Sequence, residues 1–272
     1  METHGDIESI TVTTAETRER LLTTEEEIIR YLFEDVARLP IITNRSQELW
    51  LGIQLRAVEN LDALVAPLAQ YGEGSSISQD GKTGLRPLSL MVSEAFVDAL
   101  SQLADGAAET YWSARINIAD WANDLLVARR NIYDLKNSRL RKLLDHFKRE
   151  PDSQQNAQLF ERVCNAAELL AMLPGPPLKY LASTADYDAL EPVMLLDLFP
   201  PGMDNAAYVA WLRQNANHAR HELVTGYLRY AVRVARNEYT GQLDFPDLVQ
   251  HGFLGLMKAA ERFDYRLNAR FG

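Results

Sequence analysis

Residues 247–264 read DLVQHGFLGLMKAAERFD, and this stretch decides the fold of the C-terminal part of the chain. In and just before it, apolar residues recur at intervals of three and four, the spacing of one face of an α-helix. They are Phe245, Leu248, Val249, Leu256, Ala260 and Phe263. Pro246 is compatible with the first turn of such a helix. The stretch therefore predicts an amphipathic helix with one buried face.

A second apolar stripe lies upstream, before a break at Gly241. Its members are Leu223, Tyr227, Leu228, Ala231, Val234 and Ala235. Two amphipathic helices joined by a short connection can bury their apolar stripes against each other. The sequence therefore predicts a helical hairpin at this end of the chain.

Helical spacing also dominates the rest of the chain, and no sustained alternating run predicts a sheet. We expect helices over about 25–38, 44–70 and 88–150, and the stretch 111–148, without Pro or Gly, predicts one long helix or two. Residues 71–87 are rich in Gly, Ser and Asp and predict a loop. Shorter helices are expected between the prolines at 151, 174–177 and 200–201. The predicted fold class is all-α.

Composition and charge limit the possible functions. The 272 residues are 47% hydrophobic, enough for a substantial core, and the single cysteine, Cys164, excludes an internal disulfide. No signal peptide or membrane span is predicted, so we expect a cytoplasmic protein. Residues 1–205 carry 19 Lys and Arg against 32 Asp and Glu, whereas residues 206–272 carry 9 against 6. The C-terminal part is basic, but too weakly to indicate nucleic-acid binding alone.

The stretch 247–264 resembles the sigma-factor pattern D-L-[IV]-Q-E-G-x-[IL]-G-L-[MI]-[KR]-A-[VA]-[ED]-[KR]-F-D, which is region 2.2 of that family of bacterial transcription-initiation subunits. Residues 223–239 are similar to its region 2.1, L-V-x-x-N-L-R-L-V-x-x-[IV]-A-[KR]-x-Y, with Tyr227 in place of the usual Asn and Glu238 as an extra residue before Tyr239. Residues 36–43, VARLPIIT, are similar to the region 1.2 signature I-G-R-x-P-L-L-T. The three segments occur in the family's order.

The resemblance implies a multi-helix fold like sigma-factor domain 2, with a large helical insert, in a primary-type, sigma-70-like factor. It also implies docking on RNA polymerase core, through a coiled-coil of the largest subunit. The sequence fits this, because Asp247, Gln250, Leu254, Met257 and Glu261 form a helical stripe separate from the apolar one. His251 and Phe253 stand where the family usually has Glu and Asn. The candidate partner-binding residues are Asp247, Gln250, His251, Phe253, Leu254, Met257 and Glu261.

Arg229, Arg233 and Arg236 share another helix face and are secondary candidates for nucleic-acid binding, although a basic helix face is commonly only solvated. In region 1.2 the family tends to place Arg near the promoter, where this chain has Glu34, which phosphates would repel. Promoter DNA is therefore expected as a partner only within the holoenzyme and in the complete protein.

The resemblance predicts a division into a mobile tail, 1–24, region 1.2-like helices, 25–61, a variable helical insert, 62–205, and a region 2.1–2.2-like hairpin, 206–272. The family continues after the hairpin with an aromatic helix that captures the minus-ten promoter element, so we expect the hairpin to be truncated at its C-terminal end. The alternative is a stand-alone regulator or decoy that binds polymerase without promoter-recognition elements.

Patterns typical of enzymes are incomplete. Residues 76–83 approach a phosphate-binding loop, but Ser76 stands where its first Gly belongs. His218, His221 and Glu222 lack the second His of a zinc-protease motif, because Thr225 occupies its place. We expect no catalytic residues, no metal, no cofactor and no small-molecule substrate.

Overall fold

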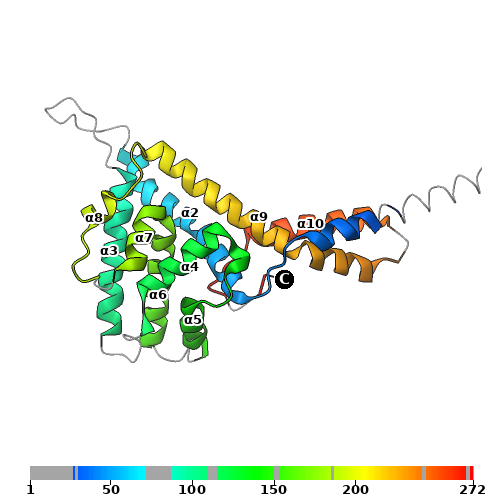
Figure 1. The fold of residues 1–272 in the computed structure, drawn as a ribbon, viewed down its shortest axis with the longest axis horizontal. Helices are drawn as coiled ribbons and strands as arrows, with labels where there is room; N and C mark the ends of the chain where they lie inside the picture. Colours follow the sequence, from blue (N-terminus) through cyan, green and yellow to red (C-terminus); the bar gives the residue numbers. More distant parts are fainter. Residues whose placement is uncertain are drawn as a thin grey trace, which may run out of the picture. The chain divides into compact units, whose positions relative to one another are not determined.

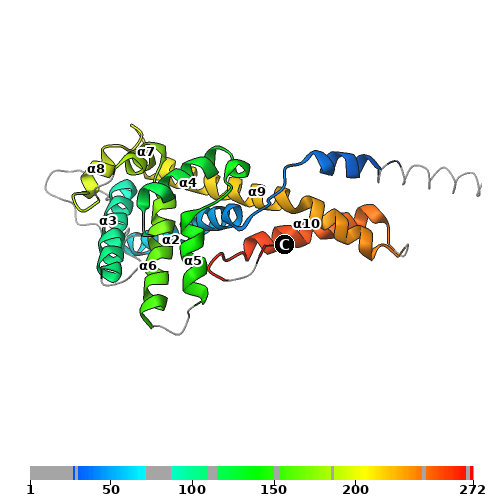
Figure 2. The ribbon, with the colours of Figure 1, turned by 60° about the horizontal axis from the view of Figure 1, so that its bottom comes forward.

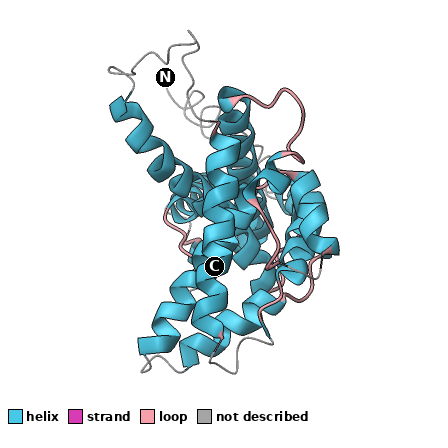
Figure 3. Ribbon diagram, turned by 90° about the vertical axis from the view of Figure 1, so that its left-hand side faces the viewer, coloured by secondary structure: helices cyan, strands magenta, loops and turns pink. Residues whose placement is uncertain are grey.

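The computed structural model describes residues 27, 30–71, 87–108, 115–149, 154–184, 187–240, 243–267 and 270–271, with only the backbone course for 62–71. The expected tail 1–24 and most of the expected loop 71–87 lie outside them. The described residues contain helices and no strand (Figure 3), so the all-α prediction is confirmed.

Ten elements follow a helix over residues 30–38, here called the 30–38 helix. In chain order they are α2 Arg45–Tyr71, α3 Leu88–Ala107, α4 Ile118–Arg130, the 3-10 turn η2 Ile132–Asp134, α5 Arg139–Arg149, α6 Gln154–Met172, α7 Gly175–Ser183, α8 Pro192–Leu196, α9 Asn205–Glu238 and α10 Phe245–Glu261. The 30–38 helix ends, and α2 begins and ends, close to where the sequence predicted.

Of the two alternatives predicted for 111–148, one long helix or two, the structure has two, because the chain turns between α4 and α5. Asn131 ends α4 with an extended backbone, and its side chain accepts a hydrogen bond from the Tyr133 amide. Ile132 and Leu135 are buried in the turn. An Asn side chain that bonds the backbone two residues later competes with helix, so this break needs neither Pro nor Gly.

The described residues form two compact units, each built from segments far apart in sequence. The first unit contains the 30–38 helix, α9 from Val224 onward and α10 to Lys258. The second contains residues 42–223 and 259–271. The domain boundaries expected from the sequence refer to family regions and stay predictions.

The first unit is a helical hairpin with a third helix beside it (Figure 1, 30–38 helix in blue, hairpin in orange to red). Its core is one small apolar cluster, whose buried members are Val36, Val232, Ala235, Phe245 and Val249. The Phe33 and Phe245 rings stack with centroids 5.7 Å apart. The predicted hairpin is present, with one correction: Val234 is 40% exposed, and Val232 takes its place because it lies on the same helix face as Leu228 and Ala235.

The second unit has a larger core. α6 packs between α3 and α5 (Figure 2) and also contacts α2, while α4 packs on α7. The largest buried side chains include Trp50, Trp121, Tyr208 and Phe96. At the start of α2, the Asn44 side chain accepts from the Gln47 amide and the Gln47 side chain accepts from the Thr43 amide. This reciprocal capping fixes where α2 begins.

Candidate functional site

Helix α10 has two faces of different character. Phe245, Val249 and Leu256 are buried, as the sequence predicted. On the opposite side Asp247 and Gln250 are exposed, and Leu254 and Met257 keep 44% and 48% of their surface exposed. A helix that already buries one apolar face and still exposes two large apolar side chains among polar ones is typical of a helix-recognition surface. We call Asp247, Gln250, Leu254 and Met257 the α10 outer face.

The two glycines of α10 have different surroundings. Gly252 lies against α9, where an added Cβ would be 3.3 Å from the Cβ of Ala231. An added Cβ at Gly255 would meet nothing within 4 Å. Gly252 therefore permits the close approach of the two helices within the first unit, whereas Gly255 leaves open space at the surface.

The two departures from the family pattern also differ from each other. His251 is exposed, and its Nδ1 lies 2.8 Å from the Asp247 carbonyl oxygen. Because a carbonyl oxygen only accepts, Nδ1 donates in this bond, and in the neutral ring Nε2 is then an acceptor. Phe253 is half-buried and packs on the apolar cluster of the first unit. Its place among the partner-binding residues stays a prediction.

Glu261, the remaining candidate on α10, is the last residue of that helix and is exposed. It belongs to the second unit. As a candidate for partner binding it also stays a prediction.

The basic stripe of α9 divides into residues with different roles. Arg229 is half-buried and donates hydrogen bonds to three backbone carbonyls, of Val36 at 3.0 Å, of Leu39 at 2.7 Å and of Ala37. The 30–38 helix ends there, so Arg229 satisfies carbonyls that the helix leaves without an internal partner. A cation near the C-terminus of a helix commonly stabilises it. The sequence did not indicate this role for Arg229, because Arg229 lies on a different helix from the one that it caps.

The other two members of the stripe are exposed. The Arg236 guanidinium lies 5.9 Å from the centroid of the Phe33 ring, within the range of a cation–π contact. Arg233 is exposed on α9. Nucleic-acid binding by Arg229, Arg233 and Arg236 stays a prediction, and Arg229 has the least freedom to serve it.

The described residues give little indication of a metal site, a phosphate-binding site or a membrane span. Within the described part of the chain, no three His, Cys, Asp or Glu side chains are grouped so as to hold a metal ion. His218 and Glu222 are 3.9 Å apart, with the His side chain 57% exposed. The approximate phosphate-binding loop at 76–83 lies outside the described residues. None of the described helices is long and apolar enough to cross a bilayer.

Comparison with known proteins agrees with this geometry. Residues 223–272, which include all of α10 and the part of α9 that pairs with it, match the Sigma-70 region 2 family. This part of the chain is similar to sigma-70 region 2, as the resemblance of residues 223–264 to regions 2.1 and 2.2 of primary-type sigma factors predicted. Two relatives, each called RNA polymerase sigma factor SigA, come from Mycoplasma genitalium and Mycoplasma pneumoniae, and each is 40% identical over 58 residues. The match covers 21% of this chain and 12% of each relative's length.

Proposed function

We propose that this chain is a transcription-initiation factor that docks on RNA polymerase core through the α10 outer face. The observation that carries the proposal is the exposure of Leu254 and Met257 beside Asp247 and Gln250, on a helix whose other face is buried. The Sigma-70 region 2 match supports it. It also favours an initiation factor over a stand-alone decoy.

The chemistry of the α10 outer face fits a basic helical partner surface, such as a coiled-coil of the polymerase's largest subunit. Asp247 and Gln250 can accept hydrogen bonds from Arg or Lys side chains. Met257 offers an adaptable apolar contact, and the open space at Gly255 lets a partner backbone come close. Promoter recognition would follow from this docking, because the family reads promoter DNA as part of the holoenzyme.

The test is a titration of purified polymerase core with the full chain, followed by fluorescence anisotropy at two salt concentrations. The variant Asp247→Arg with Gln250→Ala places a positive charge opposite a basic partner and removes an acceptor. We expect its affinity to fall at least about tenfold, as for the loss of central interface residues. Binding of the unaltered chain should weaken as salt rises.

A matched control is available on α3. Asp98 and Gln102 are exposed, one helical turn apart, and joined by a hydrogen bond of 2.7 Å. Asp98→Arg with Gln102→Ala makes the same chemical change away from the α10 outer face, and we expect affinity within about twofold of the unaltered chain. An unaltered chain that fails to bind core, or equal losses in both variants, contradicts the proposal.

A further inference from the structure

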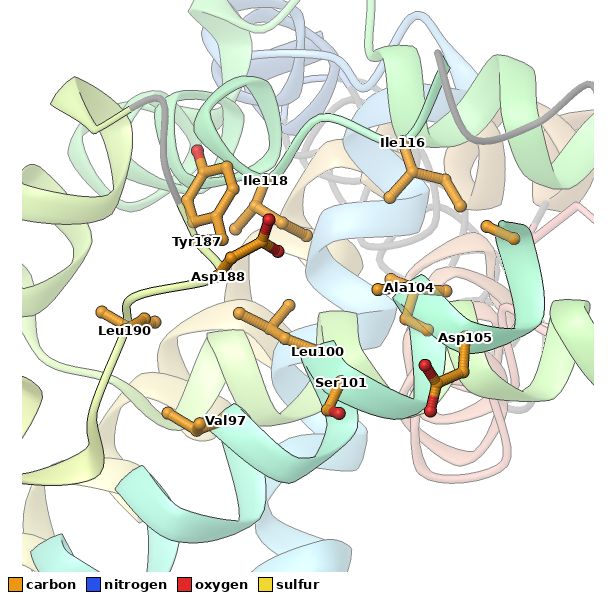
Figure 4. Close-up of a pocket in the computed structure, with 12 residues that line it drawn as sticks. Val97, Leu100, Ser101, Ala104, Asp105, Ile116, Ile118, Tyr187, Asp188 and Leu190 are labelled. Atoms are coloured by element: carbon orange, nitrogen blue, oxygen red, sulfur yellow. The ribbon is translucent and has the colours of Figure 1, made fainter. Parts of the chain in front are cut away.

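The second unit contains a groove that the proposed function does not use. It has a volume of about 730 Å³ and lies between α3, the start of α4 and the segment 187–190. Its apolar surface comes from Val97, Leu100, Ala104, Ile116, Ile118 and Leu190. Figure 4 shows the carboxyl groups of Asp188 and Asp105 flanking the side chains of Leu100 and Ala104.

The groove extends along α3. Its α3 residues run from Val97 to Ala107, which at 1.5 Å per residue is about 15 Å, or nearly three turns of a docked helix. Apolar surface continues next to it, because α8 begins two residues after Leu190, packs on α3 and exposes Val193 and Met194 by 54% and 40%. Apolar side chains therefore line the groove and continue beyond it on α8.

The charged residues that line the groove are Asp105 and Asp188, and both are acidic. Residues 87–108 and 187–204 together hold seven Asp and Glu and no Lys or Arg. Arg115 and Arg162 are cations close to these segments in sequence or in space. Arg115 precedes the lining residue Ile116, and Arg162 contacts α3 at Gln102 and Gly106, on the opposite side of that helix from the groove. A partner that carries positive charge beside apolar side chains would complement this surface.

We propose that the groove binds an amphipathic basic helix of a partner protein, with leucine-like side chains on the apolar surface and Lys or Arg beside Asp105 and Asp188. The chain's own residues 1–26 are a poor occupant, because they carry seven acidic residues against two basic ones. Nucleic acid and anionic lipid surfaces are negatively charged, so the acidic residues of the groove would repel them as well. This proposal does not depend on polymerase docking.

The experiment uses the full chain and a labelled 18-residue Leu–Lys peptide with leucines at helical spacing, measured by anisotropy at about 150 mM salt, where long-range attraction is largely screened. The groove variant is Ser101→Arg with Asp105→Lys, both exposed lining residues. The control is Asn237→Arg with Glu238→Lys at the exposed end of α9, which changes the formal charge by the same amount. A third variant, Ala104→Trp, fills the groove without changing its charge.

We expect saturable binding to the unaltered chain, at least tenfold weaker binding to the groove variant and to Ala104→Trp, and a change of less than twofold in the control. A Leu–Glu peptide of the same design should not bind. Equal weakening in the control would mean general charge attraction and would overturn the proposal. Equal binding of the Leu–Glu peptide, or no saturable binding of the Leu–Lys peptide, would overturn it too. Circular dichroism of each variant checks that the helices are intact.

Discussion

The first unit and the second unit have cores of different size and chemistry. In the first, a small apolar cluster holds three helices together, while Tyr230, Val234, Leu254 and Met257 remain 40–49% exposed. In the second, a large core encloses a carboxylate, Glu168, which has no exposed surface. The exposed apolar side chains of the first unit are available to contact a partner. The buried carboxylate of the second unit instead holds segments of that unit together.

The buried carboxylate of Glu168 joins three segments of the second unit. It accepts hydrogen bonds from the Tyr265 hydroxyl and the Asn60 side chain, each at 2.6 Å, and from the Arg266 guanidinium at 2.8–3.0 Å. Arg56 lies 3.6 Å away. Burial raises the pKa of Tyr265, and Glu168 raises the pKa of Arg266 despite the opposing effect of that residue's own burial. The network therefore keeps a charged pair and a neutral phenol together.

The largest expected effect is that of Glu168→Ala. The substitution leaves Arg266, Tyr265 and Asn60 without their shared acceptor, and removing one partner of a buried ion pair costs about 3–5 kcal/mol. Cys164, one turn earlier on α6, is fully buried, and burial raises the pKa of its thiol to about 12. We expect thiol labelling by a disulfide reagent to be very slow in the unaltered chain. In the variant it should be about a hundredfold or more faster, because about 1.4 kcal/mol corresponds to a factor of ten in the opening equilibrium.

The control for this prediction is Glu161→Ala. Glu161 is also a partner of Arg266, at 3.3 Å, but its side chain is 64% exposed. Exposed ion pairs contribute little, so the labelling rate of Cys164 should stay within a few-fold of the unaltered rate. If both substitutions accelerate the labelling of Cys164 by a similar factor, the buried carboxylate of Glu168 contributes no more to the stability of the second unit than the exposed one of Glu161.

The next effect in size concerns the first unit, where Arg229→Met removes the donors to the carbonyls of Val36, Ala37 and Leu39. Hydrogen bonds from a charged donor are worth about 1.5–3 kcal/mol when buried. Because Arg229 is only half-buried, we expect a loss of about 1–2 kcal/mol in the stability of the first unit. Amide hydrogen exchange in residues 30–38 measures it.

Arg233→Met is the matched control, since Arg233 is exposed on the same helix. Its effect on exchange in residues 30–38 should stay within about 0.5 kcal/mol. If the two variants behave alike, the capping role of Arg229 is excluded, and the three arginines are again equivalent candidates for phosphate contact.

The sequence predicted much of the first unit, because helical spacing determines which face of α10 is buried and which is exposed. It could not predict that Arg229 caps the 30–38 helix, since that contact joins residues about 190 positions apart. The Glu168 network depends in the same way on three distant segments, and its one local sign was a carboxylate within the apolar run of α6. The end of α4 at Asn131 depends on a local side-chain bond that competes with an otherwise favourable helical pattern.

The smallest effect separates the two glycines of α10 and brings stability and recognition together. Gly255→Ala adds a methyl group in open space and replaces a poor helix former by the best one, so we expect the first unit to gain about 0.5–1 kcal/mol. Gly252→Ala has the same intrinsic advantage but brings a Cβ to 3.3 Å from that of Ala231, so its gain should be smaller or negative. Thermal unfolding measures both. If the open space at Gly255 lets a partner come close, the Gly255→Ala variant should be more stable and yet bind polymerase core more weakly. A gain in stability with unchanged affinity would instead restrict the docking surface to the side chains of the α10 outer face.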